Sequence, residues 1–164
     1  MRPKNVRGRR FFTVAGLLIA LAAASSSCMP QHRDASQGSA GVEETLAAII
    51  AADKRSDVEA IVGLYTEDAV LIPPEGPSVY GRDAIRQRYS EGFEQFSMDV
   101  AFKSEETVVA GEWAYNRGQT VGTLIWHDDR EPTPLNDAYL MIRKRGPDGW
   151  LIHRLIWNRG TRSP

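Results

Sequence analysis

The chain has 164 residues, the length of a single domain, and its 42% hydrophobic and 25% charged residues are those of an ordinary globular protein, so wholesale disorder is excluded. Cys28 is the only cysteine, which rules out an internal disulfide and a cysteine-rich zinc site. Residues 1–28 carry five basic side chains and no acid, so the remainder, with 15 basic and 21 acidic side chains and a net charge of −6, is a poor candidate for binding DNA or RNA.

Residues 1–28 have the order of a secretory signal peptide. A basic stretch ends at Arg10, fourteen uncharged residues follow over 11–24, and small residues come next. Fourteen helical residues rise about 21 Å, less than the roughly 30 Å hydrocarbon core of a bilayer, so a spanning helix is not expected. Arg9-Arg10-Phe11-Phe12 also resembles the core of a twin-arginine export signal, which leaves the export route open.

The end of this segment points to a lipid anchor. Ser25-Ser26-Ser27-Cys28 resembles a bacterial lipobox, in which cleavage exposes a cysteine that is then acylated. We expect Cys28 to carry lipid and to hold the protein at a membrane, with plain signal cleavage as the alternative. Either outcome places the protein in the periplasm or cell envelope. Residues 29–41 are polar and lack apolar periodicity, so we expect a flexible tether there.

Three helices are predicted after the tether. Leu46, Ile49 and Ile50 follow helical spacing in a helix that begins near Val42. The sequence Ser56-Asp57-Val58-Glu59 has the spacing of a capping box, which predicts a second helix from Ser56. Residues 69–72 form a short apolar strand that ends at two prolines. A third helix is expected over residues 82–96, with Tyr89 in its apolar stripe.

The second half of the chain has the pattern of strands. We expect them over residues 98–109, 112–126, 136–145 and 150–158, with turns at Ala110-Gly111 and at residues 146–149. Helices followed by hairpin-linked strands indicate an α+β fold, with the helices packed on one face of a mostly antiparallel sheet.

At this point the chain resembles a known family. The carriers of the resemblance are residues 53–74, Val79-Tyr80-Gly81-Arg82-Asp83-Ala84-Ile85, residues 111–115 and residues 150–158. They resemble the SnoaL-like, ketosteroid-isomerase-like group of the nuclear transport factor 2-like superfamily, and within it the domain-of-unknown-function 4440 branch. The resemblance spans about residues 42–158, and we assign 42–160 to this domain. It implies an α+β cone, a curved sheet wrapped around helices with a pocket inside.

The resemblance does not decide the activity, because members of one fold differ in function. Ketosteroid isomerases have a carboxylate base just after the first strand, where this chain has Ile72-Pro73-Pro74, and relatives commonly carry an acid in the last strand, where it has Leu155. A proton shuttle needs such a base, so that interpretation is weakened.

Other polar residues remain as candidates. His153, with Asp137 and Tyr139, is the acid/base candidate set, because two-residue alternation places His153 on one strand face with Leu151, Leu155 and Trp157. A structural role for His153 is the alternative.

Four aromatic residues are candidates for a ligand-binding wall, with core or dimer-face packing as the alternative: Tyr89, Trp113, Tyr115 and Trp157. The three histidines are too far apart for a metal site, and no cofactor is expected.

Three functions remain open. The leading one is an exported protein whose cone-shaped cavity binds a small, largely apolar molecule. The others are an enzyme of the isomerase, dehydratase or cyclase kind, and a dimeric interaction module without a working cavity. We also expect a homodimer through the exposed face of the sheet, since both faces of the last strand carry apolar residues.

Overall fold

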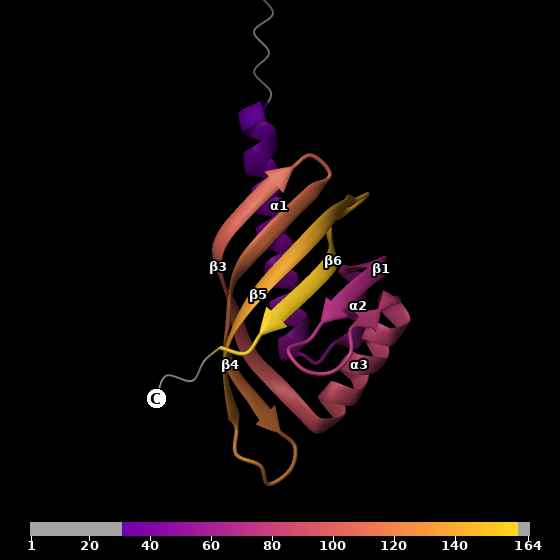
Figure 1. The fold of residues 1–164 in the computed structure, drawn as a ribbon, viewed down its shortest axis with the longest axis vertical. Coiled ribbons are helices and arrows are strands. Elements are labelled where there is room, and N and C mark those ends of the chain that lie inside the picture. Colours follow the sequence, from indigo (N-terminus) through magenta and orange to yellow (C-terminus); the bar gives the residue numbers. More distant parts are fainter. Residues whose placement is uncertain (1–30, 161–164) are drawn as a thin grey trace, which may run out of the picture.

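Six strands form one curved sheet in the order β2-β1-β6-β5-β4-β3. The computed structural model describes residues 31–160. The helices are α1 (Gln31–Lys54), α2 (Val58–Gly63) and α3 (Gly81–Gln95), and the strands are β1 (Tyr65–Ile72), β2 (Val79–Tyr80), β3 (Phe96–Ala110), β4 (Trp113–Trp126), β5 (Thr133–Gly146) and β6 (Gly149–Asn158). In Figure 1, α1 runs behind the long strands while α2 and α3 lie at the β1 edge. This is the α+β cone that the sequence predicts.

Strand pairing is antiparallel throughout, except that β1 runs parallel to β6. The long β3–β4 hairpin turns at Gly111, whose φ of 62° lies in the left-handed region that glycine adopts without strain. Gly122 lets the two strands approach closely, because a Cβ atom there would lie 2.1 Å from the carbonyl oxygen of Asp99. The expected hairpin therefore forms, and its sheet bends.

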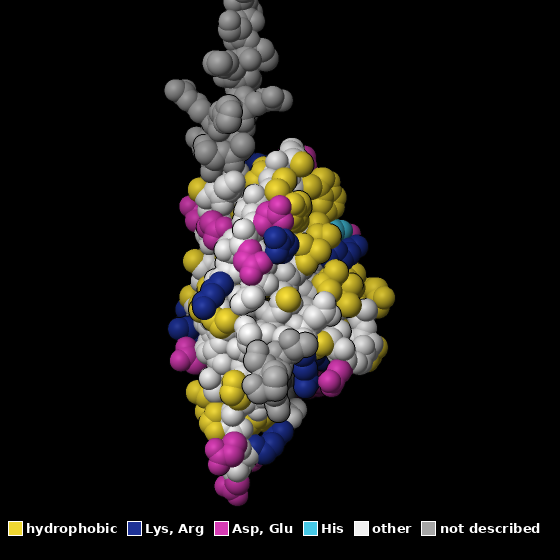
Figure 2. Space-filling model, turned by 60° about the vertical axis from the view of Figure 1, so that its left-hand side comes forward, with side chains coloured by type: hydrophobic (Ala, Val, Ile, Leu, Met, Phe, Trp, Pro, Cys, Tyr) yellow, Lys and Arg dark blue, Asp and Glu magenta, His cyan; other side chains and the backbone are white. Residues whose placement is uncertain are grey.

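The two faces of the sheet differ in what covers them. On the inner face, side chains of β1, β5 and β6 pack with Leu46 and Ile49 of α1 and with Ile61 and Val62 of α2 to form the main core. Burying one such side chain is worth roughly 1.5–3 kcal/mol. The outer face carries exposed hydrophobic residues, including Val108, Trp113 and Ile125. Figure 2 shows hydrophobic side chains gathered toward the upper right of the view.

Helix α1 begins eleven residues earlier than expected, at Gln31 rather than Val42, so residues 31–41 are helical and not a flexible tether. Glycines hold this segment against the sheet. A Cβ atom on Gly38 would lie 2.9 Å from Val109 Cγ1, and one on Gly41 would lie 3.0 Å from Trp150 Cδ1. Apolar periodicity misses such a contact, because the contacting residue has no side chain.

The other element boundaries lie within a few residues of prediction, with two local corrections. The N-cap of α2 is Asp57 rather than Ser56, since Asp57 Oδ1 accepts a hydrogen bond from the Ala60 amide at 3.0 Å. Strand β1 begins at Tyr65, four residues before the predicted strand, and this places Tyr65 in the core.

Strand β6 contains a bulge that changes which residues face inward. Ile142 pairs with Arg154 while its neighbour Arg143 pairs with Ile152, so His153 is an extra residue in β6. Beyond the bulge, Leu155 and Trp157 face inward together with Trp150 and Ile152. The predicted face shared by Leu151, His153, Leu155 and Trp157 is therefore wrong.

The segment predicted to be a signal peptide, with Cys28, lies outside the described residues. Within residues 31–160, no helix has the length and apolar character needed to cross a membrane.

Candidate functional site

A cavity of about 1090 Å³ lies between the inner face of the sheet, the end of α1 and α3. Much of its wall is apolar, with contributions from Leu71, Phe93, Phe102, Leu124, Leu155 and Trp157. Polar side chains that reach it include Asp53, Tyr89, Asp137 and Tyr139. An apolar cavity of this size with a few polar groups suits a small organic molecule.

Asp53 is the most unusual group in this wall. It lies in the last turn of α1 and is only 2% exposed, and its Oδ1 atom has no hydrogen-bond partner among the described residues. Burial raises the pKa of the Asp53 carboxyl group from 3.8 to about 7, because a carboxylate loses its hydration there. At neutral pH the group therefore exchanges a proton readily, and one oxygen is free to meet a ligand.

Tyr65 and Tyr89 form a hydroxyl pair near this carboxyl group. Their hydroxyl oxygens lie 3.2 Å apart, and the rings are tilted against each other. Burial raises the pKa of both phenols, and the charge of Asp53 raises each further. Both hydroxyls therefore stay protonated and within electrostatic reach of Asp53, Tyr89 at the cavity wall and Tyr65 behind it.

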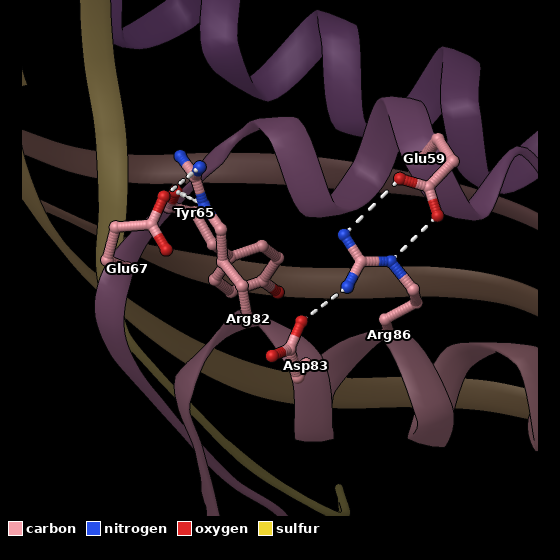
Figure 3. A network of polar contacts seen from close by, with 6 residues as sticks. All are labelled: Glu59, Tyr65, Glu67, Arg82, Asp83 and Arg86. Atoms are coloured by element: carbon pink, nitrogen blue, oxygen red, sulfur yellow. Dashed lines mark hydrogen bonds and ion pairs between the residues drawn. The ribbon is translucent and has the colours of Figure 1, made fainter.

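An ion-pair network holds the elements that carry these tyrosines (Figure 3). Arg82 of α3 donates from Nε to the Tyr65 carbonyl oxygen at 2.7 Å and also pairs with Glu67 of β1. Arg86, one turn later, bridges Glu59 of α2 at 2.7 Å and Asp83 at 2.6 Å. Single exposed pairs stabilise little, but this network joins α2, β1 and α3 on the side of the fold where the two hydroxyls meet.

A second polar chain fixes Tyr139 on the opposite wall. The Tyr139 hydroxyl donates to Asn116 Oδ1 at 2.8 Å, and Asn116 Nδ2 donates to Ser104 Oγ at 2.7 Å and to Thr107 Oγ1 at 2.8 Å. Thr107 in turn donates to Glu43 of α1 at 3.2 Å. Burial raises the pKa of Tyr139 to about 12, so its hydroxyl acts as a donor already engaged by Asn116.

Four of the predicted site residues line the cavity: Tyr89, Asp137, Tyr139 and Trp157. Asp137 Oδ1 accepts a hydrogen bond from the Gly160 amide at 3.3 Å. The Trp157 ring lies beneath the guanidinium of Arg88, whose Cζ is 5.9 Å from the ring centre. The cavity thus brings these residues together, but Asp137 bonds to Gly160 and Tyr139 to Asn116 rather than to each other.

His153 is not in the cavity wall, because the bulge turns it to the outer face. Its Nδ1 lies 3.0 Å from Thr66 Oγ1 and 3.5 Å from Asp68 Oδ1, and its ring meets Trp113 edge-on. Burial lowers the pKa of His153. Trp113 is 42% exposed on the same outer face, and Tyr115 shares that face beside Glu106. The acid/base set of His153, Asp137 and Tyr139 is therefore not assembled.

The sequence contains a pattern that points to Asp53, although Asp53 is not among the predicted site residues. Asp53 is four residues after Ile49 and seven after Leu46, so helical spacing puts its side chain on the buried stripe of α1. Burying an unpaired acid on an apolar helix face destabilises the folded protein, so such an acid is a candidate functional residue. Tyr65 continues the helical spacing of Ile61 and Val62, which predicts it in the apolar stripe of the second helix, but it begins β1 instead.

Among residues 31–160, no three His, Cys, Asp or Glu side chains gather as a metal site would require.

Comparisons with known proteins agree with this geometry. The family described as "SnoaL-like domain" matches residues 42–148. No curated protein matches the chain. Among solved structures, a ketosteroid isomerase-like protein from Erwinia carotovora atroseptica is 28% identical, with a TM-score of 0.69 over 75% of this chain and 96% of the other.

Two further structures share the fold at lower identity. A proposed dehydratase of the NTF2-like family from Streptomyces avermitilis is 15% identical, with a TM-score of 0.68 over 77% of this chain and 98% of the other. A proposed scytalone dehydratase from Novosphingobium aromaticivorans is 16% identical, with a TM-score of 0.67 over 75% of this chain and 84% of the other.

Proposed function

Since the chain belongs to the SnoaL-like family, we propose that its cavity binds a small, largely apolar molecule and presents the Asp53 carboxyl group to a polar oxygen of that molecule. One observation carries the proposal: a buried carboxyl oxygen, without a partner among the described residues, belongs to a cavity wall that is apolar over much of its area. The open cavity also favours binding over an interaction module, for which a filled interior is expected.

The two parts of the wall have different tasks. The apolar side chains supply affinity in proportion to the apolar area that they remove from water, about 25 cal/mol per Å². Asp53 supplies selectivity, because its pKa of about 7 lets it donate to a carbonyl oxygen or accept from a hydroxyl. A ligand without such an oxygen leaves that carboxyl group unpaired.

Matched probes test this division. We expect the protein to bind 2-naphthol about fivefold or more tightly than naphthalene, and we expect the Asp53→Leu variant to bind the two equally. Asp99→Asn, which removes an exposed acid on β3, is the control and should keep the preference. Isothermal titration calorimetry gives the affinities. Failure to bind either probe, or equal affinities in the unmodified protein, would contradict the proposal.

Proton-transfer catalysis of the isomerase, dehydratase or cyclase kind is the second candidate. The raised pKa of Asp53 favours it, because a general acid/base works best when its pKa is near the working pH. The names of similar structures, a ketosteroid isomerase-like protein and proposed dehydratases, point the same way.

A simple ketone tests the catalytic candidate. Removal of a proton next to a carbonyl exchanges it for deuterium in heavy water, and 2-tetralone reports this exchange by NMR. We expect the protein to accelerate exchange by about 10²-fold or more and Asp53→Asn to lose that acceleration. Asp99→Asn should retain it. Binding of 2-naphthol without any acceleration would leave a binding protein and exclude this catalysis for Asp53.

We further propose that the protein acts outside the cytoplasm, anchored through Cys28. The support is the order of charged, apolar and small residues in positions 1–28.

A further inference from the structure

Arg143 is a buried charge that is poorly compensated. It lies on β5, its side chain is 0% exposed, and its Nε and Nη1 atoms have no hydrogen-bond acceptor among the described residues. Its Nη2 atom donates to the sulfur of Met141 at 3.2 Å. A thioether is a weak acceptor, so it compensates little of the lost hydration.

Such an arrangement is unfavourable for the folded protein by itself. Burial lowers the pKa of Arg143 to about 10, yet the guanidinium still carries its charge at neutral pH. Buried polar groups in native proteins are nearly always hydrogen-bonded, and an exception calls for an explanation. An apolar residue of similar size at this position would be more stable.

Arg143 lies behind the cavity wall, on the strand face two of whose other residues line the cavity. Asp137, Tyr139, Met141 and Arg143 follow one another on the inner face of β5, and the first two line the cavity. Because the Arg143 guanidinium contacts Met141, its side chain runs back along the strand in that direction. Burial raises the pKa of both Tyr139 and Tyr65, and the charge of Arg143 offsets part of that rise, which places it within electrostatic reach of the cavity wall.

Two acids could be expected to neutralise this charge, the buried Asp53 and the exposed Glu43, and neither does. Burial alone raises the pKa of Asp53, without a contribution from Arg143. Glu43 accepts hydrogen bonds from Ser104 and Thr107, and its charge raises the pKa of Arg143 by less than burial lowers it. No nitrogen of the Arg143 guanidinium is hydrogen-bonded to an acid among the described residues, so the charge has no direct carboxylate partner there.

We propose that Arg143 is an anion-binding residue at the inner end of the cavity, and that its partner is a carboxylate group carried by the cavity's ligand. Met141 separates the guanidinium from the wall, and its unbranched side chain can move aside. Nη2 is then free to form, with a neighbouring N–H group, the planar two-pronged donor that matches a carboxylate. This inference rests on the proposed function and adds the class of ligand.

Two probes of one shape isolate the charge. At pH 6, where Asp53 is mostly protonated, 2-naphthoate is an anion and 2-naphthamide is neutral. We expect calorimetry to show about tenfold or tighter binding of the naphthoate, and the Arg143→Met variant to lose this preference while it still binds the amide. Lys144→Met removes the neighbouring exposed cation and should keep the preference.

The variants separate the possible failures. If the unmodified protein binds naphthoate and naphthamide equally, the anion site is wrong while the proposed cavity function stands, a result that does not depend on whether Arg143→Met folds. If neither probe binds, both proposals fail. A third outcome is that the protein does not prefer naphthoate but is more stable to heat in chloride than in gluconate, and that Arg143→Met loses this stabilisation. This result would show a site for free inorganic anions and overturn the carboxylate assignment.

We also expect Arg143→Met without ligand to melt at a higher temperature than the unmodified protein. A lower melting temperature for the variant would contradict the uncompensated charge.

Discussion

The hydroxyl oxygens of Tyr65 and Tyr89 lie 3.2 Å apart, although one residue begins β1 and the other lies in the middle of α3. Tyr65 is fully buried and Tyr89 lines the cavity, so this contact connects the core with the ligand space. The hydrogen bond from Arg82 to the Tyr65 carbonyl oxygen holds the start of β1, and so the backbone of Tyr65, against α3.

The tyrosine pair predicts an asymmetry in stability. Tyr89→Phe leaves the Tyr65 hydroxyl buried without its partner, which costs about 1–3 kcal/mol. Tyr65→Phe costs less, because the Tyr89 hydroxyl still reaches the cavity. The double variant should be more stable than Tyr89→Phe alone, since no orphaned hydroxyl remains. Urea unfolding measures all three, and equal losses for the two single variants would contradict the pairing.

Asp53 predicts an unusual dependence of stability on pH. Its pKa is about 7 in the folded protein, against 3.8 for an exposed carboxyl group such as that of the unfolded chain, so the folded state binds the proton more tightly. The contribution of Asp53 to the free energy of unfolding should therefore be highest in acid and fall by up to roughly 1.4 kcal/mol per pH unit as the pH rises from about 4 to 7. Asp53→Asn removes this slope, and the difference between the two unfolding curves measures it. A difference that does not vary with pH would show that Asp53 has an ordinary pKa.

Cys28 predicts a membrane attachment. We expect the unmodified protein in the membrane fraction of cells and the Cys28→Ser variant in the soluble fraction. Two or three acyl chains are needed for stable anchoring, so the mass of the purified N-terminal peptide should exceed that of its amino acids accordingly. Equal partitioning of the two forms would leave plain signal cleavage as the explanation.

The outer face of the sheet predicts a homodimer. Val108, Trp113 and Tyr115 lie on this face beside one another, and Trp113 is 42% exposed. Exposed apolar patches on a sheet face are typical of association sites. Light scattering at micromolar concentration should give a dimer for the soluble Cys28→Ser chain and a monomer after Trp113→Glu is added. Tyr80→Glu, which changes an exposed aromatic residue at the sheet edge, is the control. A monomer before any change on this face excludes the dimer.

The sequence predicted correctly those elements whose apolar residues recur with a regular period or that contain a turn residue. The helix expected over 82–96 forms at Gly81–Gln95, and the hairpin around Gly111 forms as expected, because each has a strong stripe or a turn residue. The start of α1 could not be predicted from apolar periodicity. Gly38 packs closely against Val109 because it has no side chain, so the contact leaves no apolar residue in the pattern. The candidate site was predicted only in part. Tyr89, Asp137, Tyr139 and Trp157 reach the cavity, whereas His153 is turned away by one extra residue that no spacing rule anticipates.

That extra residue bears on how the chain can change in length. If His153 were deleted, Arg154 alone would stand between Ile152 and Leu155, and ordinary alternation would keep both inward, with Trp157 still in the cavity wall. The deletion would remove only outward contacts, those to Thr66, Asp68 and Trp113. An insertion after Leu155 would instead turn Trp157 to the outer face. The outer surface of β6 can therefore lose a residue without altering the interior, but the interior tolerates no change of spacing beyond the bulge.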